Sequence, residues 1–120
     1  MKIRSRIFLV IIVFCAFFLL LNQAKIRAVV YNNRGTAYFN KEGYDQAIQN
    51  YDKAIELNPN FAEAYNNRGN AYEDKGEYDQ AIQDYNKAIE LDPENAEFYT
   101  NNRKLAEKLK KIYKKIADYY

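Results

Sequence analysis

The side chains able to do chemistry in this sequence are mostly acids and amides. The 120 residues include 16 Asp and Glu, no His and a single Cys. Because Cys15 lies inside an apolar run, the chain cannot assemble a transition-metal site, a Ser-His or Cys-His dyad, or an internal disulfide. The carboxylates have no neighbouring nucleophile or base, so we expect no enzymatic activity, no metal and no cofactor. The remaining chemistry is recognition, by amide hydrogen bonds and by carboxylate attraction of cations.

These amides and acids belong to a repeated unit. Residues 28–61 match residues 62–95 at 22 of 34 positions, far more than shared composition would give. Aromatic and small residues recur within each copy at spacings of three, four and seven, which mark one face of a helix. Pro59 and Pro93 close the two copies, because proline stops a helix. Each copy is therefore predicted to form two short helices joined by a turn.

The pattern resembles the tetratricopeptide repeat (TPR) family, whose unit is a helix-turn-helix of 34 residues. The resemblance rests on Tyr, Gly and Tyr in the first helix, followed by Ala, Tyr, Ala and a closing Pro, and it covers residue 28 to about residue 95. One departure lies at the inner turn, which reads Glu42-Gly43 in the first copy and Gly76-Glu77 in the second. We expect the first turn to run one residue late, because glycine readily takes the left-handed conformation that ends a helix.

The predicted fold is all-α, a TPR solenoid of two repeats, residues 28–61 and 62–95, preceded by a hydrophobic helix within residues 1–27 and closed by a capping helix over residues 96–120. The four repeat helices are expected at about Val29 to Lys41, Tyr44 to Leu57, Phe61 to Lys75 and Tyr78 to Leu91. Most of the 12 tyrosines fall on packing faces and are predicted to be core residues. In the first helix Tyr31, Ala37 and Tyr38 are expected to be buried.

In TPR proteins the first helix of each repeat lines a concave surface that receives a partner segment, and the resemblance implies the same here. The candidate partner-binding residues on this surface are Asn32, Thr36, Phe39, Asn40, Asn66, Asn70, Glu73 and Asp74, with Val29, Asn33, Glu63 and Asn67 on or near it. Its amides could pair with a partner's backbone, and its acids favour a basic partner. The alternative is a set of solvated helix faces, on which Asn33 and Asn67 bond only to the neighbouring helix.

Some TPR modules grip the C-terminal carboxylate of chaperones with lysines and asparagines. The groove of this chain has Asn66 and Asn70 but no lysine, and Glu63 and Glu97 stand where a positive charge would help. That activity is therefore not expected.

The first 27 residues have the form of a secretory signal or a signal-anchor, because three basic residues precede an unbroken apolar run, Ile7 to Leu21. A helix to Ala24 would span about 27 Å, close to the roughly 30 Å of a bilayer core. Asn22 makes cleavage after Ala24 a poor fit, so a retained anchor is favoured over a cleaved signal peptide. A buried core helix fits badly, because the run is apolar all the way round. The charge distribution places the repeats outside the cytoplasm, either anchored or, after cleavage, secreted or periplasmic.

After residue 95 a third unit begins but does not finish. Leu105, Leu109, Ile112 and Ile116 form an apolar stripe that we expect to cover the last hydrophobic face of the array, and Lys104, Lys108, Lys111 and Lys115 follow another face. Contact of these lysines with a membrane surface is the alternative to a solvated face, whereas nucleic acid is not an expected partner.

These features predict a membrane-anchored or exported scaffold that binds a protein or peptide partner in its concave groove. The alternative is a structural protein that self-associates at the membrane. Two repeats are few for a stable array, and the exposed start at Val29, Val30 and Tyr31 could be covered by a second copy, which would make a homo-oligomer.

Overall fold

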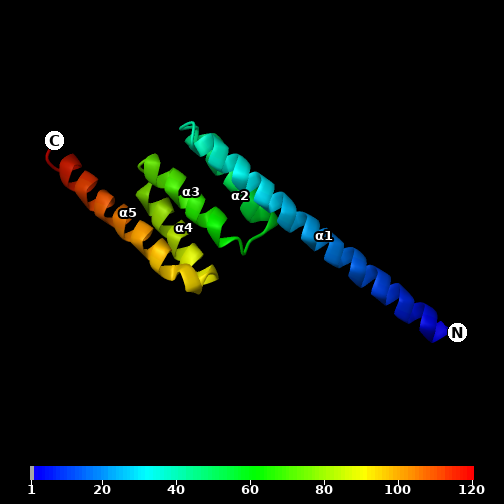
Figure 1. Ribbon diagram of the computed structural model, residues 1–120. Coiled ribbons are helices and arrows are strands. Elements are labelled where there is room, and N and C mark those ends of the chain that lie inside the picture. The colour runs from blue at the N-terminus through cyan, green and yellow to red at the C-terminus, as the bar shows by residue number, and fades with distance from the viewer. Residues whose placement is uncertain (1) are drawn as a thin grey trace.

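The computed structural model describes residues 2–120, and this part of the chain consists of helices joined by short turns, with no β-strand. Five α-helices follow one another, α1 (Lys2–Phe39), α2 (Tyr44–Leu57), α3 (Ala62–Asp74), α4 (Tyr78–Leu91) and α5 (Ala96–Ala117), with the short 3₁₀ helix η1 (Pro93–Asn95) before the last (Figure 1). The molecule measures 81 × 28 × 20 Å, because the first half of α1 projects from a compact bundle. This arrangement confirms the predicted TPR-like solenoid with a C-terminal cap and an N-terminal apolar helix.

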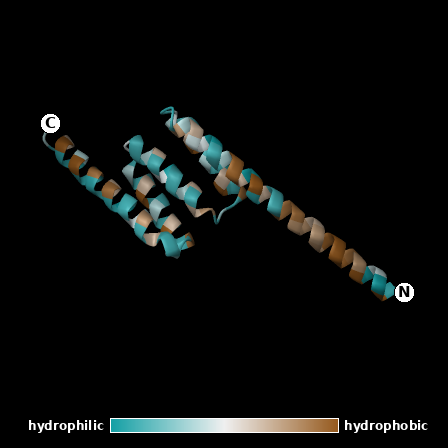
Figure 2. Cartoon of the chain, in the orientation of Figure 1, coloured by the Kyte–Doolittle hydropathy of each residue, from teal (hydrophilic) through white to brown (hydrophobic). Residues whose placement is uncertain are grey.

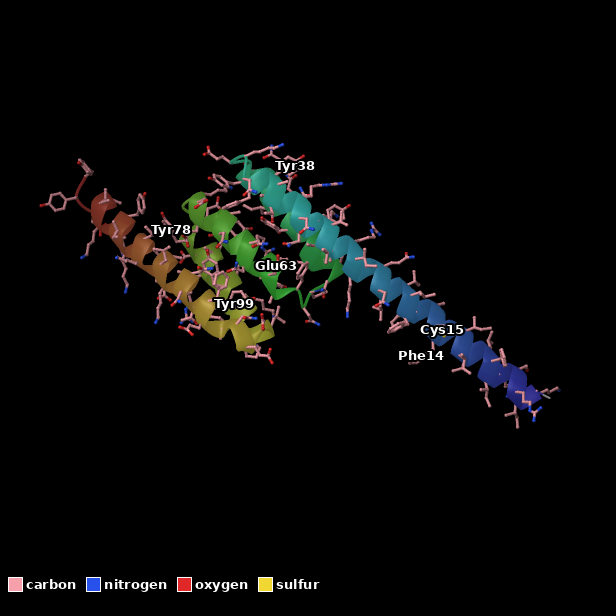
Figure 3. The ribbon with its side chains drawn as sticks, in the orientation of Figure 1. Phe14, Cys15, Tyr38, Glu63, Tyr78 and Tyr99 are labelled. Atoms are coloured by element: carbon pink, nitrogen blue, oxygen red, sulfur yellow. The ribbon has the colours of Figure 1, made fainter. Side chains whose placement is uncertain are left out.

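The first repeat helix does not start at Val29, as the sequence suggested, but continues the apolar helix without a break. No glycine or proline occurs before Gly35, so nothing in the sequence interrupts helical geometry between the apolar run and the repeat. The projecting half is apolar over Ile7 to Leu21, with polar residues on either side of this run (Figure 2), and Phe14 and Cys15 lie on it, far from the bundle (Figure 3). The repeat module is therefore a direct extension of this helix.

Each repeat is held together by a tyrosine packed against a glycine. A methyl group added to Gly35 would lie 2.5 Å from a ring carbon of Tyr51, and one added to Gly69 would lie 2.8 Å from a ring carbon of Tyr85. Both rings are about 99% buried. Only glycine leaves room for the ring at this position, which explains why the Tyr–Gly pattern recurs.

The two inner turns are equivalent, so the predicted one-residue delay in the first turn is wrong. Glu42 has φ 59° and Gly76 has φ 78°, and these positions match between the repeats. In both turns the amide that follows bonds back to a tyrosine carbonyl, Gly43 N to Tyr38 O at 2.9 Å and Glu77 N to Tyr72 O at 2.8 Å. The hydrogen bonds thus force Glu42 into the left-handed conformation that Gly76 adopts freely.

The start of the array is open. Ala37 and Tyr38 are exposed, contrary to the sequence expectation, whereas the equivalent Ala71 is fully buried. The reason is positional, because α1 and α2 cover the face of α3 that carries Ala71, and no helix within residues 2–120 precedes α1 on the same side.

The end of the array is closed by α5, which packs on α4 through a different face than expected. Tyr99 and Ala106 are the buried residues of α5, and Tyr113 stacks on Tyr78 with ring centroids 5.7 Å apart. The stripe that was expected to cover the array remains exposed, with Leu105, Ile112 and Ile116 between 42% and 49% accessible.

Candidate protein-binding groove

The first helices of the repeats carry a shallow polar hollow between α1 and α3. It encloses about 200 Å³ and is lined by Thr36, Phe39, Asn40, Tyr51, Asn67 and Asn70. Four of the predicted surface residues, Thr36, Phe39, Asn40 and Asn70, thus come together here. Glu73 and Asp74 lie one turn further along α3, beyond Asn70.

Tyrosine hydroxyls form part of the groove floor. The Tyr51 hydroxyl lies 3.3 Å from Thr36 Oγ1, and the Tyr85 hydroxyl shares its one hydrogen between Asn70 Oδ1 at 2.8 Å and Glu73 Oε2 at 3.2 Å. Each ring crosses from the second helix of its repeat, past the glycine, to the first. The groove side chains are therefore held in place by core residues.

Asn32 and Asn66 were expected on the groove surface, but the structure buries them between helices. Only 2% of Asn32 and 4% of Asn66 is exposed. Asn67 Nδ2 donates to Asn32 Oδ1 at 3.0 Å, and Asn102 Nδ2 donates to Asn66 Oδ1 at 2.9 Å. These amides join successive first helices, so their side chains are committed to packing within the chain.

The same triplet, Asn-Asn-Arg, provides this connection at residues 32–34, 66–68 and 101–103. In the second triplet Arg68 bonds to Asp84 at 2.7 and 2.8 Å and to Asp52 of the preceding repeat at 2.8 Å. In the third, Arg103 donates to Asn86 at 2.9 Å, and Asn86 is the counterpart of Asp52. The recurrence of this triplet in the sequence was the available sign that Asn32 and Asn66 are structural.

The spacing of the triplets sets the register of α5. The second and third triplets are 35 residues apart rather than 34, so each α5 residue matches the α3 residue 35 positions earlier. Phe98 then corresponds to Glu63, Leu105 to Asn70 and Leu109 to Asp74, which places three apolar side chains on the groove side of α5. The sequence pattern did not reveal this row, because Leu105 and Leu109 belong to an apolar stripe that was expected to pack on the preceding helix.

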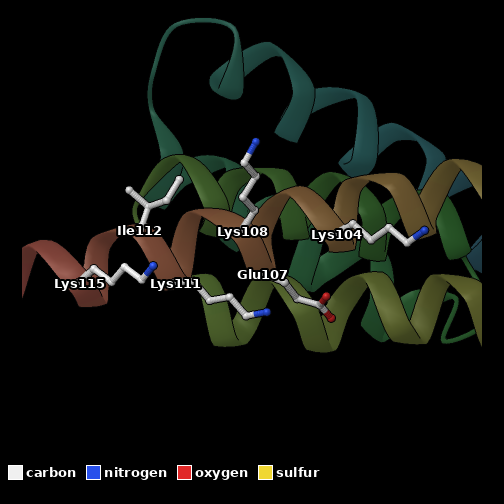
Figure 4. A pocket seen from close by; sticks show the side chains of 6 residues that line it. All are labelled: Lys104, Glu107, Lys108, Lys111, Ile112 and Lys115. Carbon is white, nitrogen blue, oxygen red and sulfur yellow. The ribbon is translucent and has the colours of Figure 1, made fainter.

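The lysines of α5 point elsewhere. Lys104 takes the repeat position of Gly35 and Gly69, where a second helix of a third repeat would pack, and it lines a separate hollow with Lys108, Lys111 and Lys115 (Figure 4). A lysine cannot accept a tyrosine ring as Gly35 and Gly69 do. This solvated basic face is what ends the array.

Two acids of α3 are held by neighbouring donors. Asn32 Nδ2 donates to Glu63 Oε1 at 3.1 Å, and Glu63 lies on the side of α3 turned toward α1 (Figure 3). The Tyr85 hydroxyl holds Glu73 in the same way. Burial raises the pKa of Glu73, the Tyr85 hydrogen bond opposes that rise, and the charge of Asp74 adds to it.

Lys75, which follows these acids in the sequence, already pairs with two other acids. Lys75 Nζ lies 2.7 Å from Asp45 and 2.9 Å from Glu77, both outside the groove. Lys108, the α5 counterpart of Glu73, is exposed on the edge of the lysine face, which is the surface formed by Lys104, Lys108, Lys111 and Lys115.

Among residues 2–120, no cluster of three or more acidic, His or Cys side chains could hold a metal ion.

One helix of the described chain is long and apolar enough to cross a membrane, namely α1. An 18-residue window in it has a mean hydropathy of 2.6, and none of that window is buried in the bundle. Length and composition support a membrane span and a signal sequence equally, since both have this form near the N-terminus.

Two family models match the chain, one described as a tetratricopeptide repeat over residues 62–95 and one as a TPR repeat over residues 35–76. Together they cover 61 residues, about half of the chain. A search of curated proteins found no significant match.

Solved structures of similar fold are also TPR domains. The first TPR of Spaghetti (RPAP3), bound to the HSP90 peptide SRMEEVD, is 31% identical with a TM-score of 0.64, and the match covers 68% of this chain and 64% of that one. The TPR domain of Arabidopsis OM64 is 28% identical with a TM-score of 0.70, covering 76% and 74%. The TPR2B domain of yeast Sti1, in a complex with an Hsp70 peptide, is 28% identical with a TM-score of 0.67, covering 73% and 74%. The chain spans slightly less than two thirds of the length of the first of these domains.

Proposed function

The chain belongs to the tetratricopeptide-repeat family, and from this premise we propose that it is a scaffold or adaptor whose groove binds a segment of another protein. The observation that carries the proposal is the groove itself, in which core tyrosines and glycines hold Thr36, Asn70 and Glu73 on one open surface. Similar domains with bound HSP90 and HSP70 peptides support a peptide as the partner.

We further propose that α1 keeps this module at a membrane and outside the cytoplasm. The unbroken helix supports the proposal, because a span over Ile7 to Leu21 would continue directly into the first repeat. Cleavage of the leader would instead release the module in a secreted or periplasmic form.

The proposal includes no catalytic step. The acids of the groove are engaged by amide and hydroxyl donors, which suits them to binding rather than to proton transfer.

Self-association through the open start of the array is the second candidate, supported by the exposure of Val30 and Ala37. Charge weighs against a symmetric pair, because residues 2–41 carry basic residues and no acid, so two copies of α1 would face each other with Arg34 opposite Arg34.

Photo-crosslinking from single positions of the full chain in its native cells tests the groove proposal. A crosslinking residue at Thr36 or Asn70 should yield the same discrete product, whereas one at Gln49 or Gln83, exposed on α2 and α4, should not. Products from the α2 and α4 positions alone would show that the partner uses the opposite surface, and a product of twice the chain mass from Ala37 would favour self-association.

A further inference from the structure

We propose that the groove selects an extended segment carrying two cationic side chains four residues apart, flanked by apolar side chains. This inference rests on the proposed function and adds the chemistry of the partner. It contrasts with the acidic HSP90 peptide SRMEEVD seen on a similar domain.

The acidic residues of the groove lie at two separate positions along α3. Glu63 lies near the beginning of α3 and Glu73 and Asp74 at its end, so the two acidic positions are roughly 16 Å apart along the helix. An extended chain covers about 13 Å in four residues, an even spacing that keeps both side chains on the same face, and the length of the lysine side chains spans the remaining few ångströms.

The carboxylates of Glu63 and Glu73 are held by hydrogen bonds. The buried amide of Asn32 orients Glu63, and the Tyr85 hydroxyl orients Glu73. Each donor occupies one carboxylate oxygen and leaves the other available, and neither carboxylate has an ion-pair partner among the described residues. Glu73 is half-buried, so a cation arriving there would offset a desolvation cost already incurred on folding.

Apolar side chains lie on both sides of the acidic residues. On one side, α1 offers Phe39 beside the second acidic position. On the other side, the 35-residue register places Phe98, Leu105 and Leu109 along α5, and Phe98 and Leu105 are 57% and 49% exposed. Acids on the central helix, with Phe39 on one side and an apolar row of α5 on the other, match a segment that carries both cationic and apolar side chains.

Fluorescence anisotropy on the full chain in detergent tests the inference with three labelled peptides of equal length and identical leucines. They carry lysine, glutamine or glutamate at two positions that are four residues apart, and SRMEEVD serves as a fourth probe. The lysine peptide should bind about tenfold more tightly than the glutamine peptide and lose this advantage as salt is raised.

Variants locate the effect. The double variant Glu63→Gln with Glu73→Gln should remove the preference for lysine, whereas Glu56→Gln with Glu90→Gln, which changes two exposed acids on α2 and α4, should retain it. Leu105→Ala should weaken all three leucine peptides, and Lys104→Ala, on the lysine face, should not. Circular dichroism checks that each variant is as helical as the parent chain.

Equal binding of the three peptides, or tighter binding of SRMEEVD than of the lysine peptide, would overturn the inference and leave the proposed function standing. Absence of binding by every probe would also overturn the inference, and the crosslinking experiment would then decide the proposed function separately.

Discussion

Arg34 and Arg68 occupy equivalent positions in the two repeats, yet only Arg68 reaches buried carboxylate oxygens. The side chain of Asp84 is 7% exposed and that of Arg68 is 20% exposed. At the position equivalent to Asp84 the first repeat has Asn50, which donates to the Gln46 carbonyl of its own helix instead. The role of a residue therefore depends on the helix that packs against it. Because the two repeats are so similar, a substitution in one can be compared with the same substitution at the equivalent position of the other.

Asp84→Ala should lower the free energy of unfolding by about 3 kcal/mol, because it leaves the Arg68 guanidinium partly buried without its main partner. Arg34→Ala, at the exposed equivalent of Arg68, should change it by less than about 0.5 kcal/mol. Urea unfolding followed by circular dichroism measures both. Equal effects would show that the Arg68 pair contributes no more than a surface charge.

Glu42→Gly should stabilise the chain by about 1 kcal/mol, because it removes the cost of a left-handed conformation at a residue with a Cβ atom. Gly76→Ala is the matched reverse change. Its added methyl group would meet nothing within 4 Å, so the expected loss of about 1 kcal/mol is purely conformational. Thermal unfolding that leaves both variants at the parent stability would contradict the equivalence of the two turns.

Binding of the lysine peptide should weaken as pH falls through the raised pKa of Glu73. The sign follows from charge, because protonation removes the negative group that attracts the cation, while Asp74 and the Tyr85 hydroxyl remain around it. The Glu73→Gln variant should show a smaller change over the same pH range. Anisotropy titrations at several pH values measure this, and identical profiles for parent and variant would exclude Glu73 as the titrating group.

At the scale of helices, the sequence pattern predicted α2 and α4 to the residue, because Pro59 and Pro93 stop them and tyrosine and alanine mark their buried faces. It failed where tertiary context decides. The helical period cannot show that α1 is continuous, that Ala37 has no covering helix, or that one inserted residue turns α5 by 100° and moves Leu105 from the packed face to the groove. Among the candidate site residues, Thr36, Phe39, Asn40 and Asn70 line one hollow, whereas Asn32 and Asn66 are buried and accept hydrogen bonds from Asn67 and Asn102 of the neighbouring first helices.

Ala71→Asp should destabilise the chain by roughly 3 kcal/mol or more, because it places a charge between α3 and the α1–α2 pair, where Ala71 is fully buried. Ala37→Asp changes the same repeat position on the open face of α1 and should be nearly neutral. Chemical unfolding of the two variants side by side checks this. A large loss for Ala37→Asp would mean that another chain covers the start of the array.

At the scale of the whole molecule, α1 and α5 run in the same direction, so the C-terminus lies at the end opposite the apolar leader (Figure 1). The hydrogen bonds from Asn67 to Asn32 and from Asn102 to Asn66 place Asn102 at about the same height as Asn32 along the direction of α1. From there, Lys104 lies roughly 15 Å and Lys115 roughly 30 Å beyond the level of Ala24. Both distances exceed the Debye length of about 8 Å, so in an anchored protein the lysine face would point away from the bilayer. The loops around Pro59 and Pro93 would face the membrane instead.

The anchor proposal predicts that the full chain stays in the membrane fraction after an alkaline wash. Phe14→Arg, in the middle of the apolar run, should release it, because a central arginine costs about 3 kcal/mol of insertion free energy. Val30→Arg, in the repeat, should not. A parent chain found only in the soluble fraction with a shortened N-terminus would show that the leader is a cleaved signal.

A chemical-shift map of the ¹⁵N-labelled full chain titrated with the lysine peptide would show directly whether the groove is the binding surface. The signals of Thr36, Asn70, Glu73 and Leu105 should shift most. Shifts confined to the outer face of α2, around Gln49 and Lys53, or to the lysine face of α5 would contradict this expectation.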